Sequence, residues 1–235
     1  MMGHNNGNAL IVVAKRPVPG NTKTRLSPPL SLQQASALYE CFLNDTLDQI
    51  RGVDAVERVI AYLPGNAHDY FHRQAPDFQL VQQVGPDLGA RLDHALTSYL
   101  SRGYNHAVIM DSDSPTLPAD HLNEAFASLS DGADVVLGPC EDGGYYLIGC
   151  SQPIPRLLRE VRMSTPTVAA DTIRLANEAG LNLVQLRTWY DVDDGDSLLR
   201  LVGEIDGLDS QTAVNTRRFL DKNLIRNLLR ETGTG

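Results

Sequence analysis

The sequence predicts an α/β protein built as a three-layer α/β/α sandwich around a mostly parallel central sheet. Short apolar runs of strand length alternate along the chain with longer amphipathic stretches of helix length. Strands that are joined through helices pair in parallel, and their helices cover both faces of the sheet. The 235 residues, 42% of them hydrophobic, can fill one large core, and no repeat or low-complexity linker divides them. We therefore expect a single domain over residues 1–235.

The apolar runs predict the strands. The first, ALIVVA at residues 9–14, is short and apolar and is followed by a loop rich in Pro and Gly. These are the features of a buried strand. Further strands are expected at residues 56–63, 78–84, 107–110, 135–137, 145–148 and 183–186.

Helices are predicted from apolar spacing and from capping residues. Ser31 and Gln34 match a capping box at the start of a long helix. Pro118 suits the first turn of another helix, and Gly180 is a suitable C-cap for a third. The predicted helices cover residues 32–51, 88–102, 118–129, 167–179, 196–205 and 211–230.

The charges separate a basic N-terminal region from an acidic remainder. The formal net charge of −9 argues against nucleic acid or an anionic membrane as a partner, because both require a basic surface. Residues 1–39 nevertheless carry four basic side chains and no acidic one, whereas the other 196 residues carry 16 basic and 29 acidic side chains. A basic loop on an acidic protein indicates a site for a small anion, and a solvated charged face is the alternative.

Cysteine usage and the N-terminus indicate a cytoplasmic protein. The three cysteines are widely spaced and form no CxxC, so neither a disulfide framework nor a zinc site is expected. The N-terminal MMGHNNGN lacks the basic and apolar segments of a signal peptide. The apolar run at 9–14 is far shorter than the ~20 residues needed to cross a bilayer. We expect no membrane span.

Polar clusters follow several of the predicted strands. In parallel sheets, ligands bind outside the carboxyl ends of the strands, so these clusters are expected to converge on one rim. They lie at residues 15–26, 111–115, 142–144 and 191–196.

The first cluster suits a phosphate group. Gly20 allows close approach of the backbone, and Thr22 and Thr24 supply hydroxyl donors. Lys23 and Arg25 can neutralise a phosphate, Arg25 in bidentate fashion. Neither a P-loop nor a dinucleotide-binding glycine pattern is present, and an ordinary Pro/Gly surface loop is the alternative.

The second cluster, DSDSP, suits a metal ion. Asp111 and Asp113 directly follow an apolar strand, and their carboxylates can bracket one ion. Mg²⁺ or Mn²⁺ binds one or two carboxylates together with phosphate oxygens and waters. A turn with an Asp helix cap is the alternative.

The acidic cluster after the last strand could complete such a site. Asp191 and Asp193 alternate, which places both carboxylates on one side of an extended segment. Asp194 or Asp196 can instead cap the following helix.

The turn at residues 142–146 suits an acceptor molecule. Gly143 and Gly144 permit backbone conformations that are closed to other residues, and Tyr145 can contribute to an aromatic wall. Asp142 can accept a proton from an acceptor hydroxyl. A hairpin turn around Asp142 and Gly143 is the alternative explanation of this sequence.

Five motifs resemble, in order, those of a glycosyltransferase-A-like family that is catalogued as a domain of unknown function. Some members of that family are labelled arsenosugar-pathway glycosyltransferases. The chain is more distantly similar to phospholactate and molybdenum-cofactor guanylyltransferases. The resemblance covers a core at about residues 9–203 and leaves a C-terminal helical extension at about 204–230. The motifs are KRPVPGNTKTRL at 15–26, GPDLGARL at 85–92, MDSDSPTLP at 110–118, DVVLGPCEDGGYYLIG at 134–149 and WYDVDDGDSL at 189–198.

The resemblance implies a nucleotide-diphospho-sugar transferase fold and a role for each motif. Nucleotide binding would involve Ala14, Lys15, Gly20, Lys23, Arg25, Gly89 and Arg91. Metal binding would involve Asp113, completed by Asp193 or Asp191; the family usually has Gly where this chain has Asp111. The acceptor would face Asp142, Gly143, Gly144 and Tyr145.

The expected activity is transfer from a nucleotide-activated donor with Mg²⁺ or Mn²⁺, in which Lys23, Arg25 and Asp142 act as catalytic residues. In the leading version, a sugar passes from a nucleotide-sugar to a small-molecule acceptor. The alternatives are nucleotidyl transfer from an NTP to a phosphorylated small molecule, with release of pyrophosphate, and nucleotide binding without catalysis. A homodimer is left open.

Overall fold

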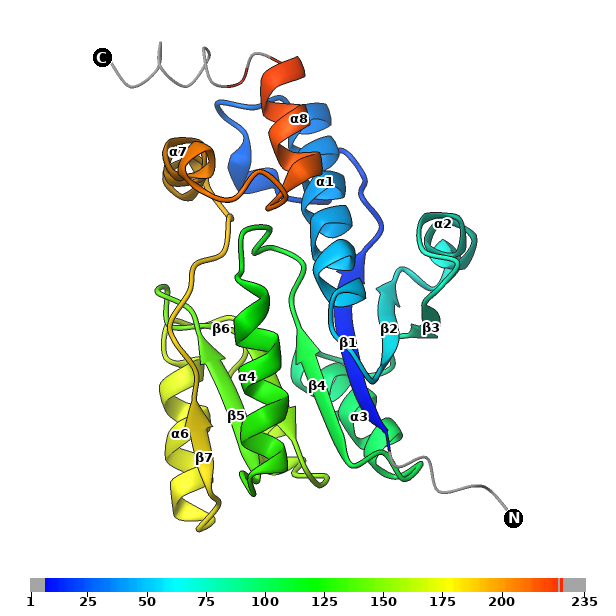
Figure 1. Cartoon of the computed structure of the whole chain (residues 1–235), viewed down its shortest axis with the longest axis vertical. Coiled ribbons are helices and arrows are strands. Elements are labelled where there is room, and N and C mark those ends of the chain that lie inside the picture. The colour runs from blue at the N-terminus through cyan, green and yellow to red at the C-terminus, as the bar shows by residue number, and fades with distance from the viewer. Residues whose placement is uncertain (1–6, 224, 226–235) are drawn as a thin grey trace. The chain divides into compact units, whose positions relative to one another are not determined.

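The computed structural model describes residues 7–223 and residue 225 (Figure 1). Within this part of the chain the strands form one seven-stranded sheet with the order β3-β2-β1-β4-β6-β5-β7. The strands are β1 (Asn8–Lys15), β2 (Val56–Leu63), β3 (Gln79–Gln82), β4 (His106–Met110), β5 (Val135–Pro139), β6 (Tyr145–Cys150) and β7 (Leu183–Gln185).

The sheet is mostly parallel, as the alternation of strands and helices predicts. Only β6 runs against its two neighbours, β4 and β5. A tight turn rather than a helix joins β5 to β6, and a short connection of this kind requires an antiparallel pair. The remaining neighbouring strands pair in parallel.

The helices agree closely with the sequence prediction. The capping box before the first long helix is confirmed, since Ser31 N donates to Gln34 Oε1 at 2.9 Å and Gln34 N donates to Ser31 Oγ at 3.2 Å. Two short helices, α2 and α5, were not expected. Of the helix predicted at 211–230, residue 224 and residues 226–230 lie outside the described part of the chain. The helices are α1 (Leu32–Arg51), α2 (His68–Gln74), α3 (Leu88–Leu100), α4 (Ala119–Ser130), α5 (Arg156–Arg159), α6 (Val168–Glu178), α7 (Gly195–Glu204) and α8 (Val214–Lys222).

Helices cover both faces of the sheet, so the three-layer prediction is confirmed. On one face, side chains of α3, α5 and α6 share a buried cluster with Ile11 and Ile109 of the central strands. On the other face lies α4 (Figure 1). A Cβ at Gly149 would lie 2.7 Å from Val108 and 3.2 Å from Leu129 of α4, so this close approach depends on glycine. Among the described residues, no helix is both long and apolar enough to span a membrane.

Contacts divide the described chain into two compact units. The sheet unit consists of residues 7–16, Ile50–Asp111 and Pro118–Trp189, and it carries the strands of the sheet. The helical unit consists of Pro17–Gln49, Ser112–Leu117 and the described residues from 190 onward; it carries most of α1 together with α7 and α8. Each unit is assembled from three separate segments of chain. The single domain expected from the sequence stays a prediction.

Candidate functional site

The basic loop of the helical unit, residues 17–26, has a constrained backbone. The buried Thr22 hydroxyl accepts a hydrogen bond from Val18 N at 3.1 Å. Gly20 has φ 80°, a conformation that favours glycine. Lys23 is also left-handed, with φ 50° and ψ 41°. Such a conformation costs a residue other than glycine about 1–3 kcal/mol and persists only where surrounding contacts enforce it.

The contacts at Lys23 are two ion pairs. Its Nζ lies 3.0 Å from Asp113 Oδ2 and forms a second ion pair with Asp193 Oδ1. The Lys23 side chain is only 7% exposed, compared with 31% for Asp113 and 38% for Asp193. Burial opposes its charge, but the attraction of both carboxylates outweighs burial and holds the pKa of Lys23 above its usual value. Lys23 is therefore a charged counter-ion that joins the two aspartates.

Two buried serines hold the loop that carries Asp113. Ser112 Oγ lies 2.9 Å from the Tyr39 hydroxyl, and Ser114 Oγ donates to the Tyr190 carbonyl at 3.2 Å. Both serines are at most 3% exposed. Sequence reasoning assigned them no role, because nothing in the pattern DSDSP separates a buried anchor from a solvated turn residue. Their hydrogen bonds fix the backbone on either side of Asp113.

The loop of Asp113 is also tied to the segment that carries Asp193. Val192 N donates to the Asp113 carbonyl at 3.0 Å. Three segments thus supply Lys23, Asp113 and Asp193, although Lys23 and Asp193 are 170 residues apart in the sequence. Of the polar clusters expected to converge, the segments that carry Lys23, Asp113 and Asp193 meet within the helical unit.

Arg25 is the exposed cation beside this group. Its side chain is 70% exposed and lies 3.9 Å from Asp193 Oδ2 and 3.4 Å from Asp194 Oδ2. Asp194 caps α7, where Ser197 N donates to its Oδ1 at 3.0 Å. The backbone hydrogen bond from Ser197 lowers the pKa of Asp194. The capping alternative for Asp194 is therefore confirmed.

The chemistry of this group fits a divalent cation. Asp113 and Asp193 offer carboxylate oxygens, the ligand type that Mg²⁺ and Mn²⁺ prefer, and a cationic group already lies against one oxygen of each. Asp111 belongs to the sheet unit and is not part of this pair. Asp191 lies two residues before Asp193 and is partly buried. The metal-binding roles of all four aspartates, Asp111, Asp113, Asp191 and Asp193, stay predictions.

The nucleotide-binding residues predicted in the sheet unit differ in their surroundings. In β1 the Ala14 side chain is buried, whereas Lys15 is exposed at the end of the strand. A Cβ at Gly89 would lie 2.1 Å from the Leu158 carbonyl oxygen, so close packing of α3 against α5 requires glycine there. The Nε of Arg91 is buried and has no hydrogen-bond partner in the described structure. Leaving a buried donor unpaired costs about 1–3 kcal/mol, and the role of Arg91 in nucleotide binding stays a prediction.

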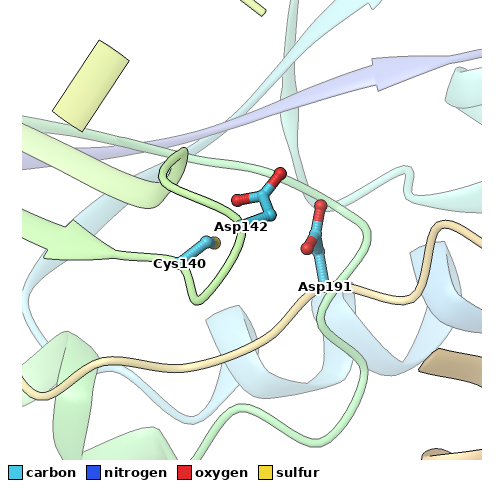
Figure 2. A group of neighbouring side chains, drawn as sticks. All are labelled: Cys140, Asp142 and Asp191. Atoms are coloured by element: carbon cyan, nitrogen blue, oxygen red, sulfur yellow. The ribbon is translucent and has the colours of Figure 1, made fainter. Parts of the chain in front are cut away.

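Figure 2 shows Asp142 on the turn between β5 and β6, in the sheet unit. Its Oδ1 accepts a hydrogen bond from Gly144 N at 2.8 Å, so the carboxylate stabilises its own turn, and the side chain is exposed. Asp191, also labelled there, belongs to the helical unit. The catalytic role of Asp142 stays a prediction.

The segment that follows α5 packs on the turn between β5 and β6. A Cβ at Gly143 would lie 1.8 Å from the Pro166 carbonyl oxygen. The Tyr145 hydroxyl donates to Met163 Sδ at 3.5 Å, and burial raises the pKa of Tyr145. The Met163 methyl would lie 3.4 Å from a Cβ at Gly89. Met163, which sequence reasoning missed and no local signal marks, therefore links the two segments predicted to bind nucleoside and acceptor.

The fold is that of the nucleotide-diphospho-sugar transferases. A crystal structure from Desulfovibrio desulfuricans G20, described as a proposed nucleotide-diphospho-sugar transferase, is 30% identical, with a TM-score of 0.87 over 95% of this chain and 97% of that chain. The chain belongs to the family described as "Uncharacterized protein conserved in bacteria (DUF2064)", whose profile matches residues 46–165.

Two nucleotidyltransferases share the fold at lower identity. A cytidylyltransferase from Leptospira borgpetersenii serovar Hardjo-bovis (strain JB197) is 13% identical, with a TM-score of 0.57 over 95% of this chain and 96% of that chain. A CMP:2-keto-3-deoxy-manno-octonic acid synthetase complexed with CTP is 11% identical, with a TM-score of 0.56 over 86% of this chain and 99% of that chain. These two likenesses concern the fold alone, and no curated protein matches the sequence. The family resemblance, the fold and the transferase class predicted from the sequence are confirmed.

Proposed function

We propose that the chain transfers a sugar from a nucleotide-diphospho-sugar to a small-molecule acceptor, with Mg²⁺ or Mn²⁺ held by Asp113 and Asp193. The observation that carries the proposal is the group formed by Lys23 and these two carboxylates, with the exposed Arg25 beside it. This arrangement supplies both charges that a metal–diphosphate complex needs: carboxylates for the ion and a guanidinium for the phosphate. It occurs in a chain whose fold is that of the nucleotide-diphospho-sugar transferases.

The residues of the helical unit would bind and orient the diphosphate. Arg25 presents a planar guanidinium that can donate two parallel hydrogen bonds to a phosphate. Gly20, without a side chain, lets the backbone of the basic loop approach a phosphate oxygen. A bound Mg²⁺ or Mn²⁺ would neutralise negative charge that develops on the leaving nucleoside diphosphate. Asp113 and Asp193 would hold that ion.

The turn of the sheet unit would serve the acceptor. Asp142 is an exposed carboxylate on a turn whose shape is determined by Gly143 and Gly144. We propose that it accepts the proton of the attacking hydroxyl, which is the task of a general base. Tyr145 would line the acceptor position.

The test is a thermal-shift screen of nucleoside-diphosphate sugars and NTPs with and without Mn²⁺, followed by product analysis. A ligand at about 100 times its dissociation constant stabilises the folded state by about 2.7 kcal/mol, which such a screen detects. We expect a metal-dependent shift that is lost in Asp113→Asn and weakened in Arg25→Ala, and retained in Asp196→Asn as the matched control. An unfolding temperature that no nucleotide changes at millimolar concentration would contradict the proposal that the protein binds a nucleotide.

Nucleotidyl transfer is the second candidate, supported by the two nucleotidyltransferases that share the fold, one of them complexed with CTP. Both chemistries use the same phosphate-binding loop and ion, so the released product separates them. Glycosyl transfer releases a nucleoside diphosphate, whereas nucleotidyl transfer releases pyrophosphate. Tight nucleotide binding with neither product, across a panel of acceptors, would indicate a binding protein without catalysis.

A further inference from the structure

The Lys23 ammonium lies against one oxygen of each carboxylate that would hold the proposed metal ion. It lies 3.0 Å from Asp113 Oδ2 and is also paired with Asp193 Oδ1. Mg²⁺ binds carboxylate oxygens at about 2.1 Å and carries twice the charge of an ammonium. Both cations cannot hold the same two oxygens, because a divalent ion there would repel the ammonium at close range.

We propose that Lys23 is a built-in counter-ion that the divalent ion displaces, and that the displaced ammonium then binds the phosphates of the nucleotide. This inference rests on the proposed function and adds an order of events to it. In the metal-free protein, Lys23 keeps Asp113 and Asp193 together and neutralises their repulsion. When the ion takes over the carboxylates, the ammonium becomes available to the polyphosphate.

The position of Lys23 suits this exchange. Its side chain is 7% exposed, so in the metal-free state the charge is withheld from ligands rather than presented to them. An ammonium is a compact charge on a flexible four-carbon stem, which can move while the backbone stays in place. Arg25 differs, because it is 70% exposed and lies 3.9 Å from Asp193, beside the carboxylate pair rather than between its members.

The exchange predicts coupling between metal and polyphosphate. A polyphosphate that binds the Lys23 ammonium removes the competitor of the metal ion, so each ligand tightens binding of the other by the same factor. Without the ammonium at position 23, the metal ion has no competitor to displace. This part of the coupling between metal and polyphosphate then disappears.

The first experiment measures Mn²⁺ binding alone, by the loss of the free-ion EPR signal during titration of wild type, Lys23→Met and Arg25→Met. We expect Lys23→Met to bind Mn²⁺ about tenfold more tightly than wild type, since it frees both oxygens and removes a close positive charge. Arg25→Met is the matched control, because it removes a nearby charge without freeing either oxygen; we expect its affinity to change by less than about threefold. Unchanged or weaker Mn²⁺ binding by Lys23→Met would overturn the inference.

A second measurement uses wild type alone and does not depend on a variant that folds. The sequence has three lysines, Lys15, Lys23 and Lys222, so acetylation by acetic anhydride can be followed at each by mass spectrometry. We expect Mg²⁺ alone to raise the acetylation rate of Lys23 several-fold and to leave that of the exposed Lys222 unchanged. A Lys23 rate that stays constant or falls as Mg²⁺ saturates the protein contradicts displacement.

The outcomes separate this inference from the proposed function. If wild type binds a nucleotide with Mn²⁺ but Lys23→Met shows no gain in Mn²⁺ affinity, the displacement fails and the function stands. If Lys23→Met gains Mn²⁺ affinity but no nucleotide binds any variant, the displacement stands and the function fails.

Discussion

Gly143 meets two constraints that no other residue can meet at its place in the turn. Its φ is 87°, and a Cβ would lie 1.8 Å from the Pro166 carbonyl oxygen. We expect Gly143→Ala to lower the free energy of unfolding by at least about 2 kcal/mol, because strain and a backbone clash add. Urea unfolding measures this loss.

Gly203→Ala is the matched control for that substitution. Gly203 lies inside α7, and nothing is within 4 Å of an added Cβ. Alanine in a helix is favoured over glycine by about 0.5–1 kcal/mol, so this variant should be as stable as wild type or slightly more so. Equal stability of Gly143→Ala and Gly203→Ala would show that the turn at Gly143 is not constrained as described.

The start of α7 should lose stability in acid. Hydrogen bonds from Ser197 lower the pKa of Asp194 in the folded state, whereas an unfolded Asp titrates near ~3.9. Just below that value the unfolded state binds more protons, so stability rises with pH there. The contribution of Asp194 is thus present above about pH 4 and is lost as pH falls through its lowered pKa.

Asp194→Asn isolates this effect, because Asn still caps a helix but does not ionise. Urea unfolding at about pH 5 and about pH 3 should show a smaller loss of stability for Asp194→Asn than for wild type. The difference should be small, since the Asp194 side chain is 43% exposed and solvent screens it. Equal losses of stability in wild type and Asp194→Asn on acidification would mean that Asp194 does not contribute to the acid sensitivity.

Helix α8 takes its N-terminal cap from another helix. Its own N-cap residue, Ala213, forms no side-chain hydrogen bond. Instead Asp45 of α1, 3% exposed, accepts hydrogen bonds from the backbone N–H groups of Asn215 at 2.8 Å and Thr216 at 2.9 Å. The Thr216 hydroxyl donates to the same carboxyl group at 2.6 Å. Burial raises the pKa of Asp45, although these hydrogen bonds partly offset it.

We expect Asp45→Ala to lower the free energy of unfolding by about 2 kcal/mol, because it leaves buried donors of α8 without their acceptor. Asp48→Ala is the control, one turn further along α1. Asp48 is exposed and reaches Asn215 Nδ2 only at 3.4 Å, so its removal should cost less than about 0.5 kcal/mol. Denaturant unfolding of both variants measures the difference, and similar losses would refute a specific cap by Asp45.

At the scale of the whole molecule, the counter-ion at Lys23 predicts how folding responds to chelation. Wild-type protein should unfold at the same temperature with and without EDTA, because Lys23 neutralises Asp113 and Asp193 when no metal is present. Lys23→Met should unfold at a lower temperature than wild type in EDTA and recover on addition of Mn²⁺, since the two carboxylates then lack the ammonium between them and repel each other. Differential scanning calorimetry tests this. A wild type that unfolds at a lower temperature in EDTA, although no metal was added beforehand, would argue against the counter-ion.

Sequence patterns predicted the elements of this fold closely. The helix at 32–51 and the strand at 56–63 have the bounds of α1 and β2. Local chemistry sets such bounds: apolar periodicity, a capping box at Ser31, and Gly180 with φ 67° after α6. The short α2 and α5 escaped prediction because a helix of one or two turns carries too little periodicity to be recognised.

The sequence by itself determined the fold class, the order of the elements and the kinds of side chain at the candidate site. These follow from local periodicity and from the rule that ligands lie at the carboxyl ends of parallel strands. Only the tertiary structure decided that Lys23 is paired with Asp113 and Asp193 rather than presented to solvent. The physical reason is distance along the chain. A pair separated by 170 residues forms through packing of the segments that carry it, and no local pattern encodes that packing.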